Sequence, residues 1–218
     1  TGDIAMVLMQ KVRVIEFKGK ARSLEIGMTH QRELSSGANA DVTVQSKGST
    51  WTWEESSAQQ ILLEIEGAGF SLKADKAGGT KPKVLRSVIS LSLPANGTQE
   101  FVVKLPSPLV AAADREKFVT LDYAAARATT QKFWSDYLTA GAQFVVPDEA
   151  VNTLYRANLW HALRLPRRRD DQKDPVTIDL PYSNFAYDQL GTPWPVNQAV
   201  YVDYMLYDLR GYHAISAE

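Results

Sequence analysis

The sequence has no cysteine among its 218 residues, which excludes a disulfide-bonded scaffold and a zinc site built from thiolates. Its three histidines, at positions 30, 161 and 213, fit no metal-ligand spacing. No apolar run approaches the roughly 18 residues of a membrane-spanning helix. The net charge of -1 gives no electrostatic reason for binding nucleic acid or an anionic membrane. We therefore expect no metal, cofactor, nucleic-acid or membrane partner.

The chain begins with Thr1 and carries no signal peptide, so we expect a processed or truncated N-terminus and favour a periplasmic or secreted location. Because the sequence has no cysteine, it does not indicate whether the protein works in an oxidising or a reducing compartment. A basic run at 167–169 is followed at once by three aspartates between 170 and 174. This pattern predicts a solvated loop that neutralises its own charge, in preference to a phosphate site.

Up to about residue 109 the sequence alternates between apolar and polar residues with a period of two, which predicts half-buried strands. Clusters of Gly, Ser, Asn and Lys separate these segments and indicate short turns. Many short strands with turns between them predict two antiparallel sheets packed as a sandwich. The predicted strands are 12–17, 24–28, 41–45, 50–54, 61–66, 70–74, 84–93 and 99–105.

Two features of this region leave alternatives open. Asn96-Gly97 is a hairpin turn motif between two strands, and with Thr98 it is also a glycosylation sequon; we favour the turn. Trp51 and Trp53 lie on one face of a strand. They predict packing between the sheets, because large aromatic faces are usually buried, but they could also form a platform for sugars.

The pattern becomes helical after a proline-punctuated passage at 105–108. Asp122 is a predicted N-cap for a helix ending near Gly141, with an apolar stripe at Tyr123, Ala126, Thr130, Phe133, Tyr137 and Leu138. A second helix is predicted from Pro147, with its stripe at Val151, Leu154, Tyr155, Asn158, Leu159 and Ala162. Within it, we expect Asn158 to be a satisfied polar residue at a helix–helix contact, flanked by His161.

A long segment at 166–194 then leads into a third predicted helix, Pro195–Arg210, closed by Gly211. Its aromatic content argues against disorder, and long irregular segments in compact domains are often functional. Aromatic faces beside carboxylates and amides suit a sugar. Asp203 falls on the apolar face of the third helix, so it requires either an arginine partner such as Arg156 or Arg164, or an open ligand site. Another helix is expected to start near 211–214.

The stretches FWSDYLTAGAQFVVPDEAVNTLYRANLWHAL (133–163) and LPYSNFAYDQLGTPWPVNQAVYVDYMLYDLRGY (180–212) resemble the sandwich-to-barrel junction of six-hairpin glycosidases. These are (α/α)6-toroid enzymes related to glucoamylase, maltose phosphorylase and α-L-rhamnosidase. The resemblance implies an α+β fold in which an antiparallel β-sandwich (1–109) is followed by a linker with its helix (110–146) and the first helices of a toroid (147–218). No single-family motif is matched, and a complete toroid needs many more helices than this sequence holds. The rest of the barrel is therefore expected from another chain or a longer precursor.

The resemblance also implies which residues contact sugar. Trp194 matches the pocket tryptophan of that superfamily, and it would stack on the substrate together with Tyr187. The other candidate substrate-binding residues are Tyr182, Asp188 and Gln198. Asp188 and Asp203 are candidates for hydrogen bonds to hydroxyls, or one of them for a catalytic role. Glycoside hydrolysis needs two flanking carboxylates, and we expect that pair outside this chain.

The sequence thus predicts part of a glycoside hydrolase acting on oligo- or polysaccharide by carboxylate acid/base chemistry. A phosphorylase is an open variant, because the nucleophile is not visible. Two alternatives come from other classes. One is a non-catalytic carbohydrate-binding sandwich with Trp51 and Trp53 as its platform, and the other is a structural or assembly protein.

Overall fold

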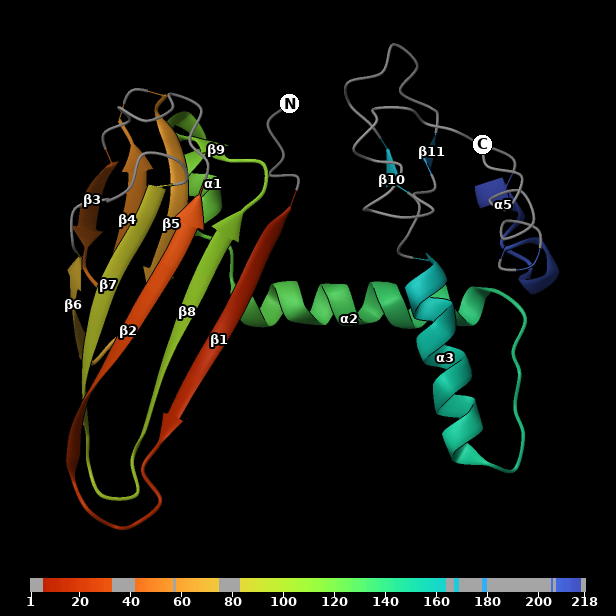
Figure 1. Cartoon of the computed structure of the whole chain (residues 1–218), viewed down its shortest axis with the longest axis horizontal. Coiled ribbons are helices and arrows are strands. Elements are labelled where there is room, and N and C mark those ends of the chain that lie inside the picture. Colours follow the sequence, from red (N-terminus) through yellow and green to blue (C-terminus); the bar gives the residue numbers. More distant parts are fainter. Residues whose placement is uncertain are drawn as a thin grey trace. The chain divides into compact units, whose positions relative to one another are not determined.

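The computed structural model describes residues 6–32, 42–56, 58–74, 83–163, 167–168, 178–179, 205 and 207–216. Two compact units are present, Thr1–Ala126 and Arg127–Glu218. The first holds antiparallel sheets and the second holds helices (Figure 1). The chain is therefore an α+β protein with a β-sandwich, as the sequence predicts.

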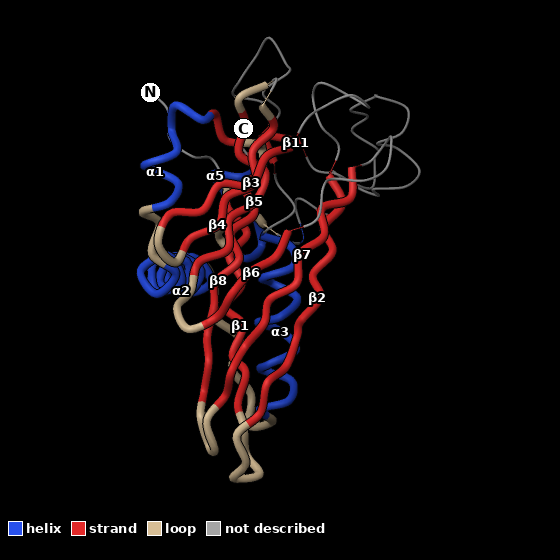
Figure 2. Tube along the Cα trace, turned by 90° about the vertical axis from the view of Figure 1, so that its left-hand side faces the viewer, coloured by secondary structure: helices blue, strands red, loops and turns tan. Residues whose placement is uncertain are grey.

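All eight predicted strands are confirmed, although their ends differ by a few residues. The strands are β1 (Val7–Ile15), β2 (Arg22–Arg32), β3 (Val42–Lys47), β4 (Thr50–Glu55), β5 (Gln60–Glu66), β6 (Phe70–Ala74), β7 (Lys83–Leu93) and β8 (Thr98–Pro106). A short β9 (Val110–Ala111) pairs with β5. The larger sheet has the order β1-β8-β5-β4-β3, and the smaller has the order β2-β7-β6 (Figure 2).

The core lies between the two sheets and draws apolar side chains from both. The larger sheet contributes Trp53, Leu63 and Phe101, and the smaller contributes Ile89 and Leu91. Each set comes from alternate positions of its strands, which is why the period-two pattern of the sequence predicts the buried face.

A β-bulge in β5 explains why that strand departs from strict alternation. Trp53 pairs with Leu63 and Glu54 pairs with Ile61, which leaves Leu62 as the extra residue. Leu62 and Leu63 consequently both reach the core between the sheets, whereas Ile61 belongs to a second cluster with Val110 and Phe118.

The hairpin predicted at Asn96-Gly97 is wrong in its pairing. A tight turn is present, with Asn96 in the left-handed region at a φ of 56°. However, β7 pairs with β2 and β6, whereas β8 pairs with β1 and β5. The turn therefore connects the two sheets, as does the loop from β1 to β2 beside it at the bottom of Figure 1.

The buried carboxylate of Glu16 ties these two connections together. It accepts hydrogen bonds from the backbone amides of Lys18 (2.9 Å), Lys20 (3.1 Å) and Asn96 (3.0 Å), and from Nε of Arg22 (3.2 Å). These bonds favour the ionised form, so the pKa of Glu16 falls from 4.5 to about 2, with the amide of Asn96 as the largest cause.

We expect Glu16 to make the sandwich sensitive to acid. Because its folded pKa lies below its unfolded value, the carboxylate stabilises the fold fully above pH 4.5, and this stabilisation is lost as the pH falls towards about 2. In that window the slope of the unfolding free energy against pH reports how many more protons the unfolded state binds than the folded state. Glu16→Gln should reduce that difference by up to about one proton. Denaturant titrations at several pH values measure the slope, and an unchanged slope would contradict the assignment.

The helical elements follow the sandwich directly. They are η2 (Ala112–Asp114), α1 (Arg115–Val119), α2 (Tyr123–Ala140), α3 (Glu149–Leu163), η4 (Asp208–Arg210) and α5 (His213–Ser216); a two-residue bridge pairs β10 (Arg167–Arg168) with β11 (Ile178–Asp179). Asp122 caps α2 as predicted, since its Oδ1 accepts from the amide of Ala125 at 2.7 Å. The helix predicted from Pro147 begins at Glu149 instead.

Candidate functional site

The residues that the sequence assigns to a sugar pocket lie outside the part of the chain that the structure describes. These are Tyr182, Tyr187, Asp188, Trp194, Gln198 and Asp203. Most of the third predicted helix, 195–210, lies there too. What the structure does show is the helical unit on either side of them in sequence, and this unit is described by itself below.

Two tyrosines fix the C-terminal segment to this helical unit. Tyr207 is buried and its hydroxyl donates to the carbonyl of Ala162 at 2.7 Å, while the hydroxyl of Tyr212 donates to the carbonyl of Tyr137 at 2.7 Å. Burial raises the pKa of both Tyr137 and Tyr212 above the ordinary value of 10.0. Between the two anchors the chain turns at Gly211, which has a φ of 82° and closes η4 as the predicted C-terminal glycine.

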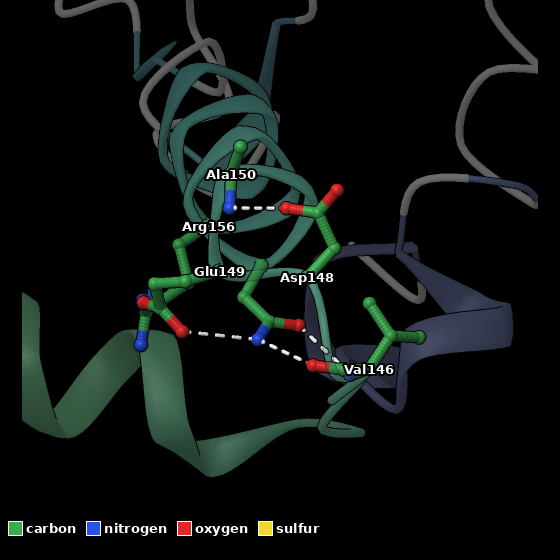
Figure 3. A network of polar contacts seen from close by, with 6 residues as sticks. Val146, Asp148, Glu149, Ala150 and Arg156 are labelled. Carbon is green, nitrogen blue, oxygen red and sulfur yellow. Dashed lines mark hydrogen bonds and ion pairs between the residues drawn. The ribbon is translucent and has the colours of Figure 1, made fainter.

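The start of α3 is held by a polar network that the sequence did not reveal. Asn152 is buried, and its side chain exchanges two hydrogen bonds of 2.9 Å with the backbone of Val146 (Figure 3). It also donates to Glu149 at 3.1 Å, and Glu149 pairs with Arg156. Asp148 caps the helix through the amide of Ala150 at 2.9 Å. This network fixes the loop that enters α3, and it engages Arg156, one of the predicted partners of Asp203.

The predicted stripe of α3 is wrong in part. The buried residues are Asn152, Leu159, Ala162 and Leu163. Val151 and Asn158 are exposed, and Leu154 is 61% exposed. Asn158 therefore does not occupy the buried helix contact that was predicted for it. The apolar stripe of helix α3 is thus buried near the C-terminal end of the helix, whereas Val151 and Leu154, nearer its start, are exposed.

Aromatic rings gather between α2 and α3. We call Phe133, Trp134, Tyr137, Trp160 and Tyr212 the helical aromatic cluster. Its closest ring centroids lie 5.4–5.8 Å apart, mostly edge to face. The predicted stripe of α2 is not buried: none of its residues is fully covered, and Phe133 is 56% exposed. The cluster thus presents aromatic surface in the unit that is expected to hold the pocket.

The sandwich offers no aromatic platform at Trp51 and Trp53. Trp53 is 1% exposed in the core, and the half-buried Trp51 stacks on Phe70 with ring centroids 4.9 Å apart. The prediction that these tryptophans pack between the sheets is confirmed. A depression of about 710 Å³ does lie over the smaller sheet, lined by Glu25, Ser71, Ser90 and their neighbours.

Over the described ranges, no group of three or more His, Asp or Glu side chains could hold a metal ion. None of the helices there has the length and apolar character needed to cross a membrane. Comparison with known proteins found no matching family model, curated protein or solved structure. The structure therefore defines the class of the protein, which is an α+β protein with a β-sandwich followed by helices. The function is inferred below from the sequence and this structure.

Proposed function

We propose that this chain is the N-terminal part of a carbohydrate-active enzyme of the six-hairpin kind, a glycoside hydrolase acting on oligo- or polysaccharide. The sandwich precedes the helices, and the toroid is continued by further helices. Sugar binds at the aromatic segment before residue 195, and a carboxylate pair elsewhere in the enzyme cleaves the glycosidic bond through an oxocarbenium-like transition state.

The observation that carries this proposal is the exposed part of the apolar stripe on α3. Leu159, Ala162 and Leu163 pack within the helical unit, while Val151 and Leu154, nearer the start of the helix, are 41% and 61% exposed. Apolar stripes of helices normally pack against a neighbouring element. Exposed apolar residues on this helix therefore support further helices that pack against it in a larger assembly.

The aromatic composition of the helical unit supports a sugar ligand. Sugar rings present apolar faces ringed by hydroxyls, so they bind where aromatic faces lie beside polar groups. Trp194, Tyr187 and Tyr182 would supply faces, and Asp188 and Gln198 would supply hydrogen bonds. The helical aromatic cluster provides further rings, among them the exposed Phe133.

Replacing Trp194 with alanine is expected to weaken oligosaccharide binding by about fivefold or more, because a stacked aromatic face contributes on the order of 1 kcal/mol or more. Titration calorimetry with glucose-, galactose- and rhamnose-containing oligosaccharides measures the affinity. Phe17→Ala is the matched control, since Phe17 is 78% exposed on the sandwich unit, and it should bind as the wild type does.

Other results would point to the other classes. If Glu25→Gln, in the depression over the smaller sheet, weakens binding and Trp194→Ala does not, the sandwich is the binding module. If the wild type binds no oligosaccharide in the panel, the carbohydrate hypothesis is wrong and a structural or assembly protein is favoured.

A further inference from the structure

A sealed group of charges lies on the outer face of the larger sheet, beneath α1. Glu64 of β5 and Lys104 of β8 are register partners, and the side chains of both are 0% exposed. Nζ of Lys104 lies 2.9 Å from Oε1 of Glu64 and 3.0 Å from Oε2 of Glu66. It also donates to the carbonyl of Val119, the last residue of α1, at 2.9 Å. A fully buried ammonium thus connects two sheet carboxylates to the helix that leads out of the sandwich.

The same helix is held at two more points. Phe118 is fully buried in an apolar cluster with Ile61 and Val110. Arg115 pairs with Glu54 of β4. Residues 112–121, which we call the exit segment, therefore rest on the sheet through one apolar anchor and two polar contacts. The charges that act on Glu64 are those of Lys104, Glu66 and Arg115, and Glu54 joins them through its ion pair with Arg115. Together they form the α1 ionic cluster: Glu64 and Glu66 from β5, Lys104 from β8, Glu54 from β4 and Arg115 from α1.

The charges of the α1 ionic cluster do not balance. Three carboxylates face two cations, but the side chain of Glu66 is 47% exposed, whereas the central pair of Glu64 and Lys104 has no contact with water. Both carboxylate oxygens of Glu64 are buried and accept no well-aligned hydrogen bond from the described residues, although Nζ of Lys104 lies 2.9 Å from Oε1 as an ion pair. An ionised carboxylate in such a place is costly. Burial accordingly raises the pKa of Glu64, although Lys104 opposes the rise.

We propose that Glu64 is a proton switch beneath α1, and that proton uptake from solvent onto its carboxylate tightens the docking of the exit segment on the sandwich. Protonation removes the buried negative charge of Glu64 and leaves Lys104 shared between Glu66 and the carbonyl of Val119. In an opened state, water would solvate Glu64 and its pKa would return towards 4.5. Since the docked state has the higher pKa, docking is tightest below 4.5 and weakens as the pH rises through the raised value.

Hydrogen exchange of the exit segment tests this proposal. The amides of Thr120 and Leu121 are direct probes, because they donate within α1 to the carbonyls of Glu116 and Phe118. After correction for intrinsic rates, their protection in the wild type should be severalfold greater at about pH 5 than at about pH 8, because the pKa of Glu64 is raised in the docked state. Glu64→Gln, which is neutral and nearly isosteric, should show the high protection at both pH values.

Glu100→Gln is the matched control, because Glu100 pairs with Lys11 and Arg13 at the exposed part of the same sheet. It should keep the pH dependence of the wild type. Equal protection of wild-type Thr120 and Leu121 at the two pH values would overturn the proposal, as would pH dependence that persists in Glu64→Gln. A ¹³C NMR titration of the Glu64 carboxyl gives a second readout that does not depend on a variant, and an apparent pKa at or below 4.5 would overturn it as well.

Discussion

Replacing Lys104 with alanine is expected to lower the free energy of unfolding by about 3–5 kcal/mol, the usual cost of removing one partner of a buried ion pair. The variant leaves Glu64 sealed without its cation and frees the carbonyl of Val119. It also removes a contact that docks α1 on the sheet. Urea titration followed by circular dichroism measures the loss.

Two comparisons isolate the cause of that loss. Lys11→Ala removes an exposed lysine that pairs with Glu100 on the same sheet, and it should cost less than about 1 kcal/mol. The double variant Lys104→Met with Glu64→Gln removes both charges and should recover most of the stability lost in Lys104→Ala. If Lys11→Ala and Lys104→Ala lower the free energy of unfolding equally, the buried pair of Glu64 and Lys104 does not stabilise the fold as predicted.

Replacing Trp53 with alanine is expected to cost about 3–5 kcal/mol, because the indole is buried and its removal leaves a large cavity. Trp53 is in contact with the core that joins the two sheets, so its loss should reduce the stability of the whole sandwich. The midpoint of chemical unfolding, with an unchanged dependence on denaturant, measures this effect.

Phe17→Ala is the control, since it removes an exposed ring of the same unit and should change stability by no more than about 0.5 kcal/mol. A Trp53→Ala variant that is as stable as the wild type, but binds oligosaccharides less tightly, would contradict the core role of Trp53. It would support the alternative that Trp53 forms a sugar-binding platform.

The strands were predictable because their burial is periodic and local. Where one face is buried, residue types alternate along the strand whichever strand is its neighbour. The pairing of strands was not predictable in the same way, because it depends on contacts far apart in sequence. Asn96-Gly97 shows the difference: its residues favour a tight turn, but nothing near them shows that β7 and β8 belong to different sheets.

The helices show a similar limit. Asp122 and Gly211 were predictable as helix ends because capping depends on the local backbone. The buried part of α3 was not, since its apolar stripe runs along the whole helix and periodicity does not show which part of the stripe is covered. Asn152 was missed because its role depends on the loop at Val146, and an asparagine one turn into a helix, shortly after Pro147-Asp148, was the signal that could have found it.

The α1 ionic cluster was also missed from the sequence. Glu64 and Lys104 occupy polar positions of alternating strands, which normally face solvent. The helix that follows the sandwich contacts Lys104 there, and that contact joins residues from separate parts of the chain. The proposed sugar pocket, by contrast, remains a prediction from sequence.

The most direct test of the sugar pocket uses the indole groups of the five tryptophans as reporters. In ¹⁵N-tryptophan-labelled protein, each indole gives one resonance, and oligosaccharide is added until the shifts saturate. We predict that the resonance of Trp194 moves while that of the buried Trp53 stays in place. Movement confined to Trp51, or no movement of any of the five, would contradict a pocket formed by the segment before residue 195.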